Sequence, residues 1–156
     1  MPRLLCQSRA TRLTARLAAI AAIAALSAPG TSVAADLVVK VSGMVEPFGQ
    51  VGCALFASPD GFPLDTAKAR MQWLPGDAKG VSCKFTGVSA GRYAISVGHD
   101  LNGNKRVDMN FVGMPTEQWG VSRGARPALR APHFDEAVFE VTAGATELVI
   151  DIKVAK

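Results

Sequence analysis

The sequence has little of what a membrane-spanning chain or a metallohydrolase needs. Its longest apolar run, Leu17 to Ala28, has 12 residues, well short of the roughly 20 that span a bilayer. Only two histidines are present, His99 and His133, and they lack the close spacing of a histidine metal site. No serine lies in a nucleophile-elbow glycine pattern. We therefore expect no transmembrane segment in the mature protein and find little support for a hydrolase.

The first 35 residues have the layout of a secretory signal peptide. Four arginines precede the apolar run, and the small-residue stretch TSVAA follows it. We expect cleavage after Ala35, with a cut near Ala28 as the alternative. This assigns residues 1–35 to the signal and residues 36–156 to a single exported domain, in the periplasm or outside the cell.

Removal of the signal changes the charge balance. The whole chain has 17 Lys and Arg against 13 Asp and Glu, and an isoelectric point of about 9.2. The signal contains four of the cations and none of the acids, so the mature part is formally neutral. The basic isoelectric point therefore gives no argument for nucleic-acid binding.

Two cysteines, Cys53 and Cys83, follow the signal. An oxidising compartment allows such a pair to persist as a disulfide, and both cysteines have the alternation parity of their apolar neighbours. The alternative is that both stay reduced as small core residues. A catalytic cysteine is not expected, because no neighbouring residue would lower its pKa.

Short segments with period-2 alternation run through the mature chain, separated by turn residues, and this pattern is typical of an all-β protein. We predict an antiparallel two-sheet sandwich, with a small closed barrel as the alternative. Residues 65–73 could form one or two helical turns. The segments AVFEVTAG and TELVIDIKVAK suggest a hairpin near the carboxyl end. The expected inward-facing side chains are Leu37, Val39, Val41, Val51, Cys53, Leu55, Val81, Cys83, Phe85, Tyr93, Ile95, Val97, Phe139, Val141, Leu148, Ile150, Ile152 and Val154.

Residues 113–134 form a long segment rich in Gly, Pro and Arg, without visible periodicity. Loops of this length in compact domains are usually functional or disordered. Trp119 could be packed on the sandwich or exposed for binding, and we expect it to be packed. Arg123, Arg126 and Arg130 complete a candidate binding edge together with His99 and Trp119.

The segment HDLNGNKRVD, residues 99–108, suggests a cation site. Asp100, Asn102 and Asn104 stand at alternate positions, as in loops that supply oxygen ligands to calcium. The further candidates are the Arg106 carbonyl and the carboxylates of Asp108 and Glu117. Position six is Lys105 and position twelve is Phe111, so the helix-loop-helix calcium motif is not matched. The alternative is a series of side-chain-to-backbone turns around Gly103 with no ion, which the cations at 105 and 106 favour.

The blocks YAISVGHDLNGNKRVDMNFVGMPTEQWGVS and PHFDEAVFEV resemble domain-of-unknown-function family 2141, whose members are exported bacterial proteins with one β-rich domain. The resemblance rests on His99 to Asn104, Asp108, the Gly113–Glu117 step and the Gly120–Ser122 step, and it implies an immunoglobulin-like or transthyretin-like sandwich. Lys105 departs from the family pattern, where a glycine is common, and so does His133. The family has no assigned activity.

We therefore expect a non-enzymatic exported accessory or binding module, with the loop of residues 99–122 as its functional edge and calcium as its candidate ion. One alternative is a metal-dependent hydrolase that uses His99 and Asp100 at the same edge, where His133 could join them around a transition metal. Another is an envelope adhesion or assembly module that binds an envelope protein or a glycan through Trp119 and the arginines. The ligand and the partner are not specified by the sequence.

Overall fold

The computed structural model describes residues 34–156, so the predicted signal peptide lies almost wholly outside the described residues. The predicted boundary falls inside the first strand, whose first residue, Ala35, is buried. No helix in the described part of the chain is long and apolar enough to cross a membrane.

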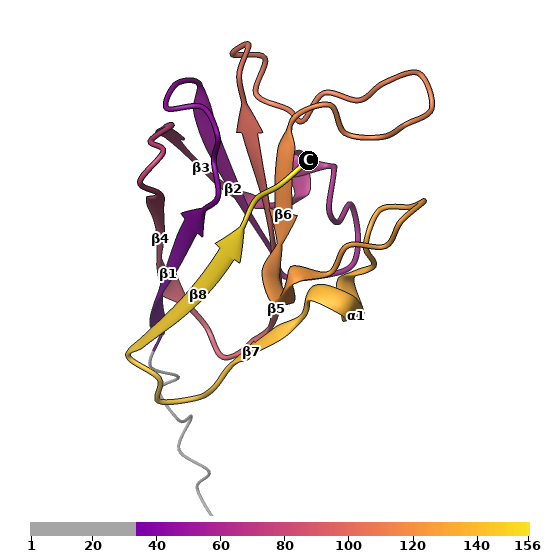
Figure 1. The fold of residues 1–156 in the computed structure, drawn as a ribbon. Coiled ribbons are helices and arrows are strands. Elements are labelled where there is room, and N and C mark those ends of the chain that lie inside the picture. Colours follow the sequence, from indigo (N-terminus) through magenta and orange to yellow (C-terminus); the bar gives the residue numbers. More distant parts are fainter. Residues whose placement is uncertain (1–33) are drawn as a thin grey trace, which may run out of the picture. The chain divides into compact units, whose positions relative to one another are not determined.

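Two sheets form the domain, and the predicted all-β sandwich with one short helix is confirmed (Figure 1). The three-stranded sheet has the order β4-β1-β8 and the five-stranded sheet has the order β3-β2-β5-β6, with β7 paired to the start of β5. The elements are β1 (Ala35–Ser42), β2 (Gln50–Phe56), η1 (Thr66–Lys68), β3 (Arg70–Pro75), β4 (Val81–Val88), β5 (Gly91–Asp100), β6 (Gln118–Val121), η2 (Ser122–Gly124), α1 (Phe134–Ala137), β7 (Phe139–Val141) and β8 (Glu147–Lys153).

The core between the sheets consists of the side chains that alternation places inward. Leu37, Val39 and Val51 are fully buried there, and Ile152 and Val154 are nearly so. The residues between them on each strand point to the outer face, because successive side chains of a strand alternate. The outer face of the five-stranded sheet is therefore a separate surface.

The Cys53–Cys83 disulfide forms inside this core. It joins β2 of the five-stranded sheet to β4 of the three-stranded sheet, with a Cα–Cα distance of 6.5 Å. Both cysteines are fully buried. The bond therefore links the two layers at their centre.

One local prediction is wrong, and two others hold only in part. β7 and β8 do not form a hairpin, because β7 pairs with β5 while β8 runs parallel to β1. In residues 65–73 only Thr66–Lys68 are helical, and β3 begins at Arg70. The segment 113–134 contains β6 and η2, so it is less irregular than its composition suggests.

A second apolar cluster covers part of the outer face of the five-stranded sheet. Phe62 packs edge-to-face against Phe56 at 5.3 Å and against Phe134 at 5.8 Å. Ala94 and Ala137 complete this packing near the start of β5. α1 packs only near the start of β5. The candidate site lies on the same outer face, toward the end of that strand.

Candidate functional site

Asp100 organises the loop that leaves β5. Its side chain is 1% exposed. One carboxylate oxygen accepts hydrogen bonds from the N–H groups of Asn102, at 3.1 Å, and Gly103, at 2.7 Å, and the other accepts from Lys105 at 2.7 Å. Lys105 has a positive φ of 60°, a conformation that a glycine would adopt with less strain. The hydrogen bonds of Asp100 therefore hold the tight turn even though position 105 is a lysine and not a glycine.

Asn102 and Asn104 connect this turn to Asp108. Their amide groups donate to the two Asp108 oxygens at 2.6 and 2.8 Å, and their own oxygens accept the N–H groups two residues further along. The hydrogen bond from Asn104 is the main cause that lowers the pKa of Asp108 below its ordinary value, and Asn102 and Arg106 add to it. Asp108 is therefore held as a carboxylate.

Glu117 closes the network from the other end of the loop. It is 5% exposed, and its two oxygens accept the N–H groups of Leu101 at 2.8 Å and of Asp108 at 3.0 Å. Five of the six predicted calcium-site residues, all but Arg106, therefore bring their side-chain oxygens into one hydrogen-bonded loop. The Arg106 guanidinium lies 3.4 Å from Asp108, and the residue contributes its N–H to Asn104.

The loop has the oxygen donors that calcium prefers, yet most of them already accept N–H groups. Among residues 34–156 no cluster of three or more His, Cys, Asp or Glu side chains has a metal-binding arrangement. Gln50 pairs directly with Asp100 across the sheet, and its side-chain oxygen is buried without a hydrogen-bond partner in the described structure. Carboxylate oxygens retain further lone pairs when they accept one hydrogen bond. A cation bound here would have to share these oxygens with the N–H groups that they already accept.

The side chains of His99 and Asp100 do not share one site, since adjacent strand residues point to opposite faces of the sheet. His99 is fully buried in the interior, with its Nε2 atom 2.8 Å from the Phe48 carbonyl oxygen and its Nδ1 atom 3.4 Å from the Gln118 amide oxygen. Gln118 also bonds the N–H of Val45 and the carbonyl of Gly43. His99 therefore anchors the loop between β1 and β2.

His133 lies apart from both residues. It directly precedes α1, whose Phe134 and Ala137 pack beside Ala94 near the start of β5. Ala94 and His99 are separated along the strand by about 17 Å at the usual rise per residue. The structure thus does not gather His99, Asp100 and His133 around one centre.

The three arginines of the predicted binding edge all bond within the protein. The Arg126 guanidinium lies over the Trp119 ring, 4.5 Å from its centroid, and donates to the carbonyls of Trp119, Ala155 and Lys156. This half-buried tryptophan is packed, as the sequence predicts. The other two arginines have partners near α1: Arg130 forms a two-point ion pair with Glu136, and Arg123 donates to the Val138 carbonyl.

A cavity that the sequence does not reveal lies on the outer face of the five-stranded sheet, the face toward which Asp100 points. Two tryptophans and two glycines form one row across four strands, in the order Trp73, Gly52, Gly98 and Trp119. The Trp73 ring lies over Gly52, where a Cβ atom would come within 2.6 Å of it. The next row contributes Ala54 and Ser96. These four small residues form the floor of a cavity of about 330 Å³, at the lower end of the range of ligand pockets.

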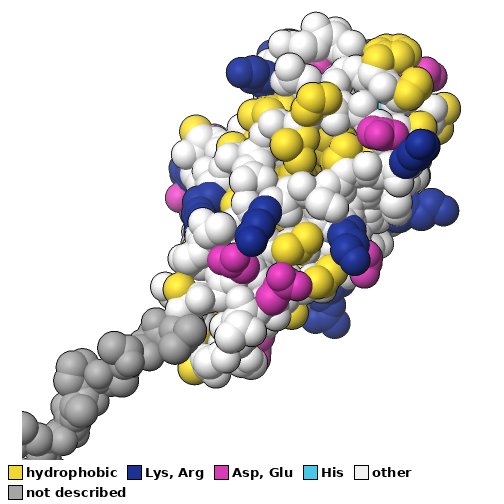
Figure 2. Space-filling model, turned by 90° about the vertical axis from the view of Figure 1, so that its left-hand side faces the viewer, with side chains coloured by type: hydrophobic (Ala, Val, Ile, Leu, Met, Phe, Trp, Pro, Cys, Tyr) yellow, Lys and Arg dark blue, Asp and Glu magenta, His cyan; other side chains and the backbone are white. Residues whose placement is uncertain are grey.

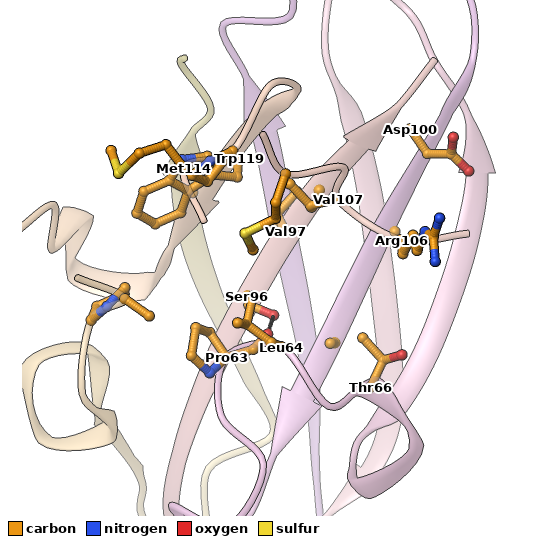
Figure 3. A pocket seen from close by; sticks show the side chains of 18 of the residues that line it. Pro63, Leu64, Thr66, Ser96, Val97, Asp100, Arg106, Val107, Met114 and Trp119 are labelled. Atoms are coloured by element: carbon orange, nitrogen blue, oxygen red, sulfur yellow. Dashed lines mark hydrogen bonds between the residues drawn. The ribbon is translucent and has the colours of Figure 1, made fainter. Parts of the chain in front are cut away.

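The walls of this cavity are mainly apolar and come from three segments. Residues 63–66 form one wall, residues 105–115 form another, and residues 127–132 close the third side. Figure 3 shows Trp119 and Met114 on one side of the cavity and Asp100 and Arg106 toward the other. The loop ordered by Asp100 is therefore a wall of the cavity.

Apolar side chains also surround the mouth of the cavity. Leu64, Val112 and Leu129 line it and are 57%, 64% and 90% exposed. Phe111, at the tip of the turn that Asn110 closes, is fully exposed. Figure 2, which faces the left-hand side of Figure 1, shows further hydrophobic side chains toward the upper end of that face, whereas the segments around the cavity mouth lie toward the right-hand side of Figure 1. Apolar groups concentrated in this way commonly mark binding surfaces.

The comparisons with known proteins give a family and no closer relative. No curated protein and no solved structure matches the chain. The family model that is described as an uncharacterized protein conserved in bacteria (DUF2141) matches residues 39–149. The resemblance carried by the sequence blocks is thereby confirmed, and the chain belongs to this bacterial family.

Proposed function

We propose that the protein is an exported, non-enzymatic binding module that takes an apolar ligand in the cavity over Gly52, Ala54, Ser96 and Gly98. The carrying observation is this cavity of about 330 Å³, with small residues as its floor and apolar side chains as its walls and mouth. The loop of residues 99–122, which the sequence singles out, forms one wall. Its network around Asp100 supports the proposal because an ordered wall lowers the entropy cost of binding.

Export is supported by two separate features. The N-terminal segment has the pattern of a signal peptide. The buried Cys53–Cys83 disulfide is typical of oxidising compartments such as the periplasm. Because Arg123, Arg126 and Arg130 all bond within the protein, the cavity is better supported as the ligand site than the arginine-rich segment.

An apolar fluorescent probe tests this proposal. N-phenylnaphthylamine, titrated into the purified disulfide-bonded protein, should increase in fluorescence with a saturable curve. The variant Val112→Asp/Leu129→Asp places two carboxylates at the mouth of the cavity, and we expect it to weaken binding by about tenfold, because the ligand loses apolar contacts there and would desolvate the new charges when it binds. Val45→Asp is the matched control, since Val45 is 73% exposed and lies outside the cavity. Absence of saturable binding, or equal losses in both variants, would contradict the proposal.

Calcium is the ion that we propose for the Asp100 loop. Its ligands would come from Asp100, Asn102, Asn104, Asp108 and Glu117, which already meet in one network, and from the Arg106 carbonyl. Calorimetric titration into chelator-treated protein should give heat, and the thermal midpoint should rise. Asp108→Asn should abolish both effects; because its amide keeps only one of the two acceptor oxygens that bond Asn102 and Asn104, the thermal midpoint of this variant without calcium is measured as its own reference. If the wild-type protein gives neither heat nor a shift, the loop is a hydrogen-bonded turn without an ion.

A further inference from the structure

The cavity has one charged end and one apolar end. Lys105 and Arg106 line it beside Asp100, whereas Met114, Trp119 and Leu129 line it elsewhere. Figure 3 shows Arg106 on the side of Asp100, away from Trp119 and Met114. A ligand that fits this arrangement has an apolar body and one polar end.

The charged end of the cavity offers two cations to a ligand. Asp100 is the only acidic residue in the lining, and three backbone N–H groups already occupy its carboxylate. Among the described residues the Lys105 ammonium has no ion pair or hydrogen bond, and Arg106 has only its 3.4 Å contact with Asp108. Arg130, the other lining cation, is neutralised by Glu136 at 2.8 Å. Lys105 and Arg106 are therefore the groups available to an anion.

The apolar part of the cavity offers little to a ligand with many polar groups. Its floor belongs to β2 and β5, which have strands on both sides, so their backbone groups are already paired. The Ser96 hydroxyl donates to the Pro63 carbonyl at 2.9 Å. A peptide or a sugar would leave several polar groups without partners there, which costs free energy. An alkyl chain has no such groups.

We infer that the ligand is a monomeric, unbranched acyl chain of medium length that ends in a carboxylate. The carboxylate lies at Lys105 and Arg106, and the chain lies over Ser96, beside the Val107 side chain that covers Gly98, toward Trp119. The volume of about 330 Å³ is at the lower end of the range of small-molecule pockets, which favours a chain of medium length over a long one. This inference rests on the proposed function, because it specifies the ligand of the same cavity.

Displacement of N-phenylnaphthylamine by matched amphiphiles tests the inference. Dodecanoate should displace the probe about twofold to fivefold more effectively than dodecanol, the upper part of the range that exposed ion pairs contribute. The preference should shrink at 0.5 M salt, where charges are screened. Lys105→Gln/Arg106→Gln should remove the preference and leave dodecanol unchanged, whereas Lys40→Gln, on the three-stranded sheet, should keep it.

The results distinguish failure of the acyl-carboxylate inference from failure of the proposed function. If dodecanoate is preferred and the preference disappears only in the Lys105→Gln/Arg106→Gln variant, the inference is supported. If the probe binds but dodecanoate and dodecanol compete equally, or if the double variant keeps the preference, the inference is overturned and the apolar binding module remains. If neither the probe nor any amphiphile binds, the proposed function itself is wrong.

Discussion

Gly98, on strand β5, lies directly against Val107 in the wall of the cavity. A Cβ atom at this position would come within 2.4 Å of the Val107 Cγ2 atom. We predict that Gly98→Ala lowers the free energy of unfolding by about 1 to 3 kcal/mol, the usual cost of overpacking. In a Val107→Ala background, which removes the clashing methyl group, the same change should cost less than about 1 kcal/mol. Urea unfolding of the four proteins gives the coupling energy, and equal costs in both backgrounds would contradict the predicted contact.

Glu136 provides a second prediction at the scale of single residues. Arg130 and the His133 N–H lower the pKa of this carboxyl from 4.5 to about 2, with the Arg130 hydrogen bond as the largest cause. Because the pKa is depressed in the folded state, its contribution to stability is present above about pH 4.5 and is lost as the pH falls toward 2. Arg130→Gln should raise the pKa yet leave it below 4.5, since the His133 contact persists. Carbon-13 NMR titration of the carboxyl measures this, and an unchanged pKa would exclude the Arg130 pair in solution.

At the scale of elements, the disulfide between β2 and β4 permits a quantitative prediction. Cys53 and Cys83 are 30 residues apart in the sequence, and a cross-link of that length stabilises a protein by about 3.5 kcal/mol on the chain-entropy model. The variant Cys53→Ala/Cys83→Val, which partly refills the space of the two sulfurs, should therefore have a clearly lower denaturant midpoint. Guanidinium unfolding measures the difference. A midpoint equal to that of the oxidised wild type would mean that the bond does not constrain the unfolded chain.

The strands that alternation predicts are those with one face in the core. β1 and β4 show this most clearly, since one set of alternate side chains is buried and the other is half-buried or exposed, whereas β2 and the end of β5 are buried on both faces. β3 gives no such signal, because four consecutive residues are half-buried on both faces. β6 has only four residues, within a segment rich in Gly and Pro. The parallel pairing of β1 with β8 could not be predicted, since alternation identifies a buried face and says nothing about the neighbouring strand.

Part of the candidate site was also predictable from the sequence and part was not. The loop network was predictable because Asp and Asn side chains at alternate positions bond to nearby backbone groups. The cavity was missed because it is assembled from three distant segments. One signal was available: Gly52, Ala54, Ser96 and Gly98 are all small and share the outward parity of their strands. Small residues on a supposed solvent face indicate that another part of the chain, or a ligand, approaches the sheet closely.

For the whole molecule, the fold depends on contact between the two ends of the described chain. β1 is the central strand of the three-stranded sheet, with β4 on one side and the last strand, β8, parallel to it on the other. Beyond β8, the Ala155 backbone pairs with Trp119 at 3.0 and 3.1 Å, and Arg126 bonds to carbonyls on both segments. The terminal strand therefore completes one sheet and connects it to the other. Such non-local pairing also implies slow folding, in milliseconds to seconds.

We predict that removing residues 147–156 abolishes cooperative folding. The deletion removes Ile152 and Val154, which are 2% and 1% exposed, and each such side chain contributes about 1.5 to 3 kcal/mol. It also opens one edge of β1, so the loss approaches the total stability of about 5 to 15 kcal/mol that is typical of a domain. Near-ultraviolet circular dichroism during heating should show no sigmoidal transition. Deletion of Lys156 alone is the control and should melt like the wild type, because Arg126 keeps two of its three carbonyl partners. A cooperative transition in the shorter chain would mean that the first seven strands fold without the eighth.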